Sequence, residues 1–345
     1  MKIYENYNII FDDIVLVNCM LYNAFQELRE EERMKLSIST DSLSAYRALG
    51  LSDLEVLEAV SKTDFKIIDY CMTNKNHAEP IIEGAAFKES LDRTGLYAYQ
   101  AHAILGYNPL LMNEKREWAF MKNALVFCEK AGIKQIVIHP GATEGNSREE
   151  FMENNAAFYR SLIPYCEETG VGVMIENIGN YADPYLLRNG EDLKELLLRV
   201  DHPMITACWD TGHANHFFPD DCDQYSSICA LGNKLTAIHF HDNAGYFSDE
   251  RKHYRIDMHM PPYMSWCGSL NYDAVLQALC DIGYQGTFNF EVTAFHFRRD
   301  VEPFHLNGNV VDKLRLPPLR LWIAMYNMIY EIGKYMLETY GVYEA

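Results

Sequence analysis

Residues 135–176, QIVIHPGATEGNSREEFMENNAAFYRSLIPYCEETGVGVMIE, hold one complete strand–helix–strand unit. The first five and the last five residues are short runs rich in β-branched side chains, which predicts two buried strands. Between them, Ser147 and Glu150 have the spacing of a capping box at a helix start. Gly170 stands where that helix must end before the second strand. Two strands joined by a helix predict a parallel sheet.

The same alternation of strand and helix recurs along the chain. Eight strands over about 310 residues give about 39 residues per unit, which is typical of a (β/α)8 TIM barrel of the α/β class. No GxGxxG pattern follows the first strand, which counts against a dinucleotide-binding sheet. The predicted strands are Met34–Ser39, Lys66–Cys71, Tyr97–His102, Gln135–His139, Gly172–Glu176, Ile205–Asp210, Leu235–His239 and Thr287–Glu291.

The chain divides into two parts. Residues 1–33 precede the first strand and form an N-terminal extension, which we expect to pack on the barrel or on a partner. Residues 34–345 form a single catalytic barrel that ends in an apolar helix from Leu319 to Leu337. This helix carries charged residues such as Arg320, so we interpret it as a buried amphipathic helix and not as a membrane span.

The composition indicates which partners the protein can bind and in which cellular compartment it is found. The chain has 49 acidic and 30 basic residues, a net charge of −19, which repels nucleic acid and anionic membranes at long range. Nine cysteines without a CxxC pair are typical of reduced thiols, and the first residues lack the pattern of a signal peptide. We therefore expect a cytoplasmic protein with neither a nucleic-acid nor a membrane partner.

Acidic and histidine residues end six consecutive predicted strands. In a TIM barrel these positions line the mouth of the active site. A buried carboxylate without a partner is costly, and carboxylates with imidazoles are the ligand set of Zn, Mn, Fe or Co. Four of the six therefore predict a divalent-metal site; each of the other two also fits a structural role. The four are Glu176, Asp210, His239 and Glu291, and the other two are His102 and His139.

From about residue 34 to 295 the sequence resembles the xylose-isomerase-like superfamily of TIM barrels. This superfamily contains sugar isomerases, ketose 3-epimerases and the apurinic-site endonucleases of family 2. The motifs that carry the resemblance are Glu176 in Ile-Glu-Asn, Asp210-Thr-Gly-His213, His239-Phe-His-Asp242-Asn, Asp257-Met-His259-Met-Pro-Pro, and Glu291 after Tyr284-Gln-Gly.

The resemblance implies roles for these residues. In the ketose epimerases, the positions that match the quartet hold one divalent metal, often Mn²⁺; Zn²⁺, Co²⁺, Fe²⁺ and Mg²⁺ stay open here. Glu176 and Glu291 match the acid/base pair of those enzymes, and His213 matches a substrate contact. In the endonucleases nine ligands hold three zinc ions, and the positions that match the five ligands beyond the quartet are His102, His139, His213, Asp257 and His259.

We therefore expect a metal-dependent isomerase or epimerase that forms an enediolate from a keto-sugar or its phosphate. Trp118 and Trp209 are candidate apolar walls of the substrate site. We expect a small sugar as substrate, and a homo-oligomer or a small partner subunit remains open. Three alternatives also remain. They are a trinuclear-zinc phosphodiesterase, a keto-sugar lyase similar to the larger subunit of C-glycoside deglycosidases, and a non-catalytic sugar-binding barrel.

Overall fold

The computed structural model describes most of the chain from residue 33 onward. Residues 1–32 lie outside it, so the N-terminal extension stays a prediction. The described residues are 33–72, 78–104, 108–110, 118–141, 147–178, 187–217, 222–245, 247–249, 252–254, 257–264, 266–293, 304–311, 313–314 and 316–345.

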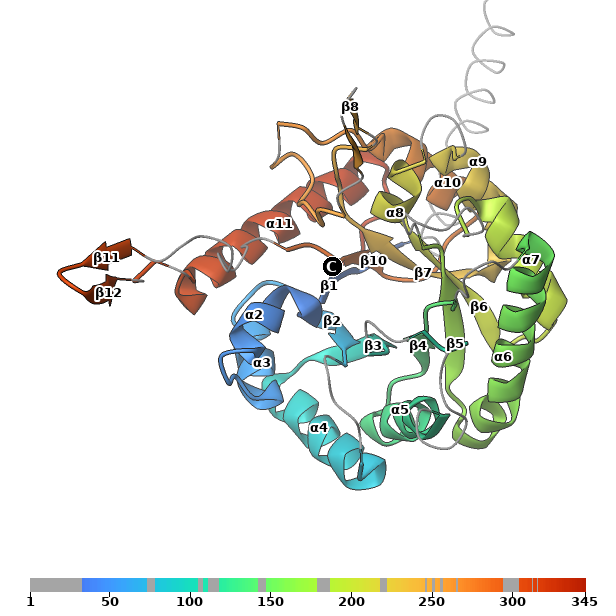
Figure 1. Cartoon of the computed structure of the whole chain (residues 1–345), viewed down its shortest axis with the longest axis horizontal. Coiled ribbons are helices and arrows are strands. Elements are labelled where there is room, and N and C mark those ends of the chain that lie inside the picture. The colour runs from blue at the N-terminus through green and yellow to red at the C-terminus, as the bar shows by residue number, and fades with distance from the viewer. Residues whose placement is uncertain are drawn as a thin grey trace, which may run out of the picture.

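Eight parallel strands close into a barrel, in the order β1-β10-β7-β6-β5-β4-β3-β2 (Figure 1). All eight strands predicted from the sequence are confirmed, with small differences at their ends. The (β/α)8 fold class is confirmed as well. The strands are β1 (Leu36–Ser39), β2 (Ile67–Cys71), β3 (Tyr97–His102), β4 (Gln135–Val137), β5 (Gly172–Glu176), β6 (Ile205–Asp210), β7 (Leu235–Phe240) and β10 (Phe288–Phe290).

Helices surround the barrel and follow its strands in sequence (Figure 1). The predicted capping box at Ser147 is present, a second one occurs at Ser52, and Gly170 follows α6 in the left-handed conformation. The helices are η1 (Thr40–Leu43), α2 (Ser44–Arg47), α3 (Asp53–Val60), α4 (Pro80–Thr94), α5 (Trp118–Ala131), α6 (Arg148–Thr169), α7 (Gly190–Val200), α8 (Thr211–Asn215), α9 (Gln224–Leu231), η2 (Gly232–Lys234), α10 (Tyr272–Asp281) and α11 (Leu319–Thr339).

The side chains of each strand alternate between the barrel interior and the helix layer. Four residues of neighbouring strands form a small buried cluster of their own inside the barrel, namely Val137, Met174, Cys208 and Ala237. Their neighbours in sequence, such as Ile136, Ile175 and Trp209, belong to the large core. A residue two positions after a member of the interior cluster therefore also faces inward.

Two short hairpins add to the barrel, β8 (Phe247–Asp249) with β9 (Lys252–Tyr254) and β11 (Phe304–Leu306) with β12 (Asn309–Val311). The second hairpin lies away from the barrel, beyond the first turn of α11 (Figure 1). Trp322, Tyr326 and Ile329 on one face of α11 are buried, as an amphipathic helix requires. Among the described residues, no helix is long and apolar enough to cross a membrane.

A buried amide fixes the loop that follows β4. Asn155 in α6 accepts a hydrogen bond from the backbone N–H of Gly141 at 2.8 Å and donates one to the carbonyl of Gly141 at 2.8 Å. It also donates to the carbonyl of Phe151. Gly141 comes two residues after His139, so this amide helps to place a histidine at the mouth of the barrel.

We predict that Asn155→Ala destabilises the fold by about 1–3 kcal/mol, because it leaves buried backbone groups of Gly141 without partners. Asn154 is exposed and adjacent, so Asn154→Ala is the matched control and is expected to stay within about 0.5 kcal/mol of the unmodified chain. Urea unfolding of the three proteins measures both values. Equal stability of the two variants would contradict the assigned role of Asn155.

Candidate metal centre

The alternation of the strands brings acidic and histidine side chains into the barrel mouth. His139, Glu176, Asp210 and His239 each follow a member of the interior cluster by two residues, so all four face inward. The parallel registers place Glu176 opposite Cys208 and Asp210 opposite His239. The carboxyl ends of four neighbouring strands therefore meet in one small volume.

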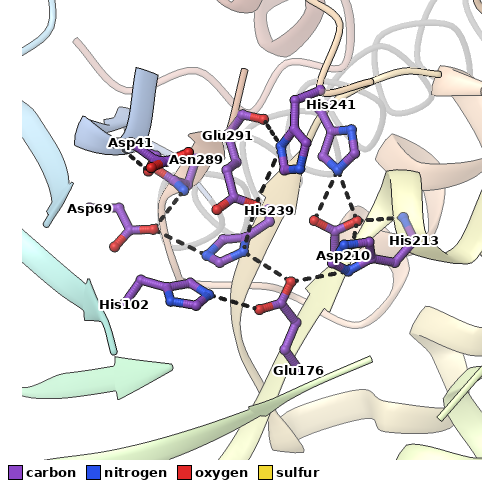
Figure 2. Close-up of polar contacts among 12 residues, drawn as sticks. Asp41, Asp69, His102, Glu176, Asp210, His213, His239, His241, Asn289 and Glu291 are labelled. Atoms are coloured by element: carbon purple, nitrogen blue, oxygen red, sulfur yellow. Dashed lines mark hydrogen bonds and ion pairs between the residues drawn. The ribbon is translucent and has the colours of Figure 1, made fainter. Parts of the chain in front are cut away.

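The four predicted ligands lie together. Glu176, Asp210, His239 and Glu291 each offer one donor atom, and these atoms lie within 4.8 Å of one another. His239 Nδ1 is 3.3 Å from Glu176 Oε1 and 3.1 Å from Glu291 Oε2, so the imidazole lies between the two glutamates (Figure 2). Glu291 is 7% exposed and the other three are fully buried.

Two further histidines hold the second oxygen of Glu176. His102 Nε2 is 3.2 Å and His139 Nε2 is 3.0 Å from Glu176 Oε2. The Nδ1 atom of His102 lies 2.8 Å from the carbonyl oxygen of Ala103, which fixes the orientation of its ring. The structure thus places both of these sequence candidates beside the quartet, on the side of Glu176.

A second cluster lies beside Asp210. It comprises His213, His241, Asp257 and His259, whose donor atoms also lie within 4.8 Å of one another. Asp257 Oδ2 is 3.2 Å from His213 Nε2 and 2.9 Å from His259 Nε2. His241 Nε2 is 3.1 Å from Asp210 Oδ1, so this ring connects the second cluster to the quartet (Figure 2).

The carboxylates and imidazoles of the site shift one another's pKa values. Burial alone would raise the pKa of Glu176, but His239 and His139 hold it well below its usual value. Burial alone would lower the pKa of His239, but the nearby carboxylates raise it well above 6.5. The pKa of His102 is raised to about 9 by Glu176 despite its burial, while burial keeps the pKa of His139 below 6.5.

The donor set fits a divalent metal. Among the described residues, the ion pairs of Glu176, Asp210 and Glu291 all connect to histidines, so imidazoles are the counter-charges that these three buried carboxylates have there. Buried carboxylates of this kind pair with cations or bind a metal. Three carboxylate oxygens and one imidazole nitrogen suit Mn²⁺, Fe²⁺, Co²⁺ or Zn²⁺.

One candidate for a substrate wall does not reach the site. Trp209 lies one position out of phase with Asp210, is fully buried in the core, and donates its indole N–H to Gln224 at 2.9 Å. The prediction that Trp209 contacts substrate is therefore wrong. Trp118 is the first residue of α5, and its side chain lies outside the described residues.

Among the described residues, two that belong to the site were not predicted from the sequence. His241 follows His239 by two positions, so the period of the strand was the signal that places it on the same face. Asp69 lies in the middle of β2, and its Oδ2 is 3.1 Å from His239 Nε2. A single acid in the apolar run Ile-Ile-Asp-Tyr-Cys was the available signal for Asp69.

The family model described as xylose isomerase-like TIM barrel matches residues 57–313, which is most of the chain. The chain belongs to this family. Among solved structures, this family member is similar to a D-tagatose 3-epimerase-like protein, with a TM-score of 0.64 and 22% identity over 89% of this chain and 98% of the other. It is also similar to the IOLI protein with a bound zinc atom, with a TM-score of 0.58 and 20% identity over 75% and 89% of the two chains.

Curated relatives match over shorter stretches. A mannonate dehydratase of Enterococcus faecalis is 28% identical over 41% of this chain and 38% of its own length. An uncharacterized protein of Methanocaldococcus jannaschii is 26% identical over 53% of this chain and 60% of its own length. The xylose isomerase-like chain thus spans less than two thirds of each of these two relatives.

We predict that metal binding releases at least one proton per chain near pH 7.5. The pKa of His239 lies well above 6.5 in the metal-free site, so a metal must displace a proton from the ring. The affinity then rises about tenfold per pH unit for each proton released, up to the pKa of the ring. Calorimetric titrations in buffers of different ionisation enthalpy count the protons, and an enthalpy independent of the buffer would contradict the prediction.

We also predict that Gly212→Ala weakens metal binding about tenfold or more. A Cβ atom at Gly212 would lie 1.9 Å from Cε1 of His241, so the ring must move away from Asp210. Gly190→Ala is the matched control, because its Cβ would lie 2.0 Å from the carbonyl of Ser227 in the helix layer. Gly190→Ala is expected to lower stability and to keep metal affinity. The same loss of affinity in both variants would contradict this account.

Proposed function

We propose that the chain is a divalent-metal-dependent isomerase or epimerase of keto-sugars. The observation that carries the proposal is the contact of both glutamates of the quartet, Glu176 and Glu291, with the same nitrogen of His239. Two carboxylates beside one metal position can remove a proton from, and return a proton to, a carbon atom of a substrate held at that position. Solved structures of similar fold support the substrate class, because they include a D-tagatose 3-epimerase-like protein and epimerases of D-allulose, D-psicose and 3-keto-D-glucoside.

Glu176, Asp210, His239 and Glu291 would hold the metal. The metal, when bound, would polarise the sugar carbonyl and make the neighbouring C–H bond more acidic. The identity of the metal is open among those that suit the ligand set, and the bound zinc of the IOLI structure makes Zn²⁺ a candidate beside Mn²⁺.

The two glutamates are held differently, which assigns them different parts in proton transfer. Within the described part of the chain, the Glu176 carboxylate is contacted by four imidazoles, with His213 and His239 at Oε1 and His102 and His139 at Oε2. Among the described residues, His239 and His259 approach the Glu291 carboxylate at Oε2, and the side chain of Glu291 is 9% exposed against 1% for Glu176. Glu291 is therefore the base that removes the proton from carbon.

The histidines keep this base ionised. Burial alone would raise the pKa of Glu291, but His239 and His259 hold it below its usual value. Glu176 then returns a proton to the other face or to the next carbon, with the imidazoles around it as the proton source. His213 Nε2 contacts Asp257 Oδ2 at the edge of the quartet, and a sugar oxygen would replace this carboxylate oxygen as the acceptor of its hydrogen bond.

We predict that Glu291→Gln lowers the rate at least about 100-fold, because glutamine cannot accept the proton. The measurement incubates the Mn²⁺-loaded protein with D-tagatose, D-allulose or D-fructose in D₂O and follows the C–H signals next to the carbonyl by NMR. Deuterium incorporation with an epimer or isomer as product is expected, whereas loss of water would instead favour a dehydratase.

Glu338→Gln is the matched control, since Glu338 is an exposed residue of α11 paired with Lys334. It is expected to exchange deuterium at the rate of the unmodified protein. Unchanged exchange in Glu291→Gln would contradict the assignment of the base. No exchange with any keto-sugar, in protein shown to hold metal, would contradict the proposed reaction.

A trinuclear phosphodiesterase is the second candidate, and one observation favours it. The second cluster supplies His213, Asp257 and His259 beside the quartet, while His102 and His139 lie on its other side. Nine side chains that match the three-zinc pattern therefore lie around the mouth. The net charge of −19 opposes the binding of DNA, so we place the sugar reaction first.

A further inference from the structure

Beneath the proposed metal site lies a buried polar network that the site itself does not use. It joins side chains from β1, β2, β3, β7 and β10, all fully buried, and Figure 2 shows the members Asp69, His239 and Asn289. The interior of a TIM barrel is normally filled by apolar branched side chains, so a polar layer at this depth needs a physical reason. The members are Ser37, Asp69, Gln100, His239 and Asn289.

The network centres on one carboxylate oxygen. Asp69 Oδ2 lies 3.1 Å from His239 Nε2, and it accepts hydrogen bonds from Gln100 Nε2 at 3.1 Å and from Asn289 Nδ2 at 3.3 Å. Ser37 donates to the Oδ1 atom of Asn289 at 2.9 Å and thereby fixes which end of that amide faces Asp69. The carboxylate is thus held from two strands while it faces the imidazole from a third.

This contact decides the tautomer of His239. A carboxylate only accepts hydrogen bonds, so an unprotonated Nε2 at 3.1 Å from Asp69 would bring two lone pairs together. Nε2 therefore keeps its proton when a metal binds, and Nδ1, the atom between Glu176 and Glu291, is the nitrogen that gives up its proton to the metal. Gln100 Nε2 also lies 3.1 Å from His239 Nε2, and both nitrogens share Asp69 Oδ2 as their hydrogen-bond acceptor.

The second oxygen of Asp69 adds to the effect. Among the described residues, Asp69 Oδ1 and Gln100 Oε1 are buried without a hydrogen-bond donor. The hydrogen bonds of the network thus reach one oxygen of the Asp69 carboxylate, and in the described part of the chain the imidazole of His239 is the cationic group in contact with it. A carboxylate that accepts from a ligating histidine raises the basicity of the ring and fixes its direction.

We propose that Asp69 is a positioning residue that sets the tautomer of His239, so that the metal binds through Nδ1, with Gln100 and Asn289 holding the carboxylate in place. This inference rests on the metal site of the proposed function, and it assigns a part to a residue outside the quartet. It predicts that removing the charge of Asp69 weakens metal binding while the barrel stays folded.

The test replaces Asp69 by its nearly isosteric amide and measures metal affinity directly. Asp69→Asn is expected to lower the affinity for Mn²⁺ about 10- to 100-fold in calorimetric titration. Asp192→Asn is the matched control, because Asp192 is a largely buried carboxylate of α7 whose ion pair to Arg148 lies in the helix layer. The control is expected to keep the affinity of the unmodified protein.

A second readout identifies the ligating atom. In ¹⁵N-histidine protein loaded with ¹¹³Cd²⁺, NMR is expected to show coupling of cadmium to Nδ1 of His239 and a proton on Nε2. Binding through Nε2, or equal affinities of Asp69→Asn and Asp192→Asn, would overturn the inference and leave the proposed function standing. Absence of metal binding by the unmodified protein would instead overturn the metal site on which both rest.

Discussion

Three carboxylates buried in the mouth of one barrel are the constraint on which the rest of the site depends. The donor atoms of Glu176, Asp210 and Glu291 lie within 4.8 Å of one another. Each of these side chains faces the barrel interior at the carboxyl end of its strand. Their mutual repulsion in a dry interior is large. The surrounding imidazoles offset this repulsion in the metal-free chain, and a divalent cation would offset it when bound.

The arrangement of the histidines follows from this constraint. His102 and His139 contact one oxygen of Glu176, and His239 contacts the other together with Glu291. These contacts set the raised pKa of His239 and the lowered pKa of the glutamates. The buried polar network beneath the site also acts on these histidines. Asp69 contacts His239, the imidazole that lies between Glu176 and Glu291.

Much of the fold and the quartet could be predicted because the barrel imposes a simple rule on its strands. A strand ending in Glu176 or Asp210 brings that side chain to the mouth whatever the loops do. The predicted set of site residues was wrong where neighbouring residues of one strand face opposite sides of the barrel wall. Trp209 faces the helix layer, whereas His241 faces inward two positions after His239. Asp69 was missed because its partner lies on β7, and only the closed barrel brings β2 and β7 across from each other.

The metal content of the protein, purified without chelator and measured by elemental mass spectrometry, tests the central claim most directly. The account predicts about one divalent ion per chain, bound at the quartet and released by chelation. About three zinc ions per chain would favour the phosphodiesterase. A chain that holds no metal even after reloading with Mn²⁺, Co²⁺ or Zn²⁺ would contradict the account, because the buried carboxylates would then be balanced by histidines alone.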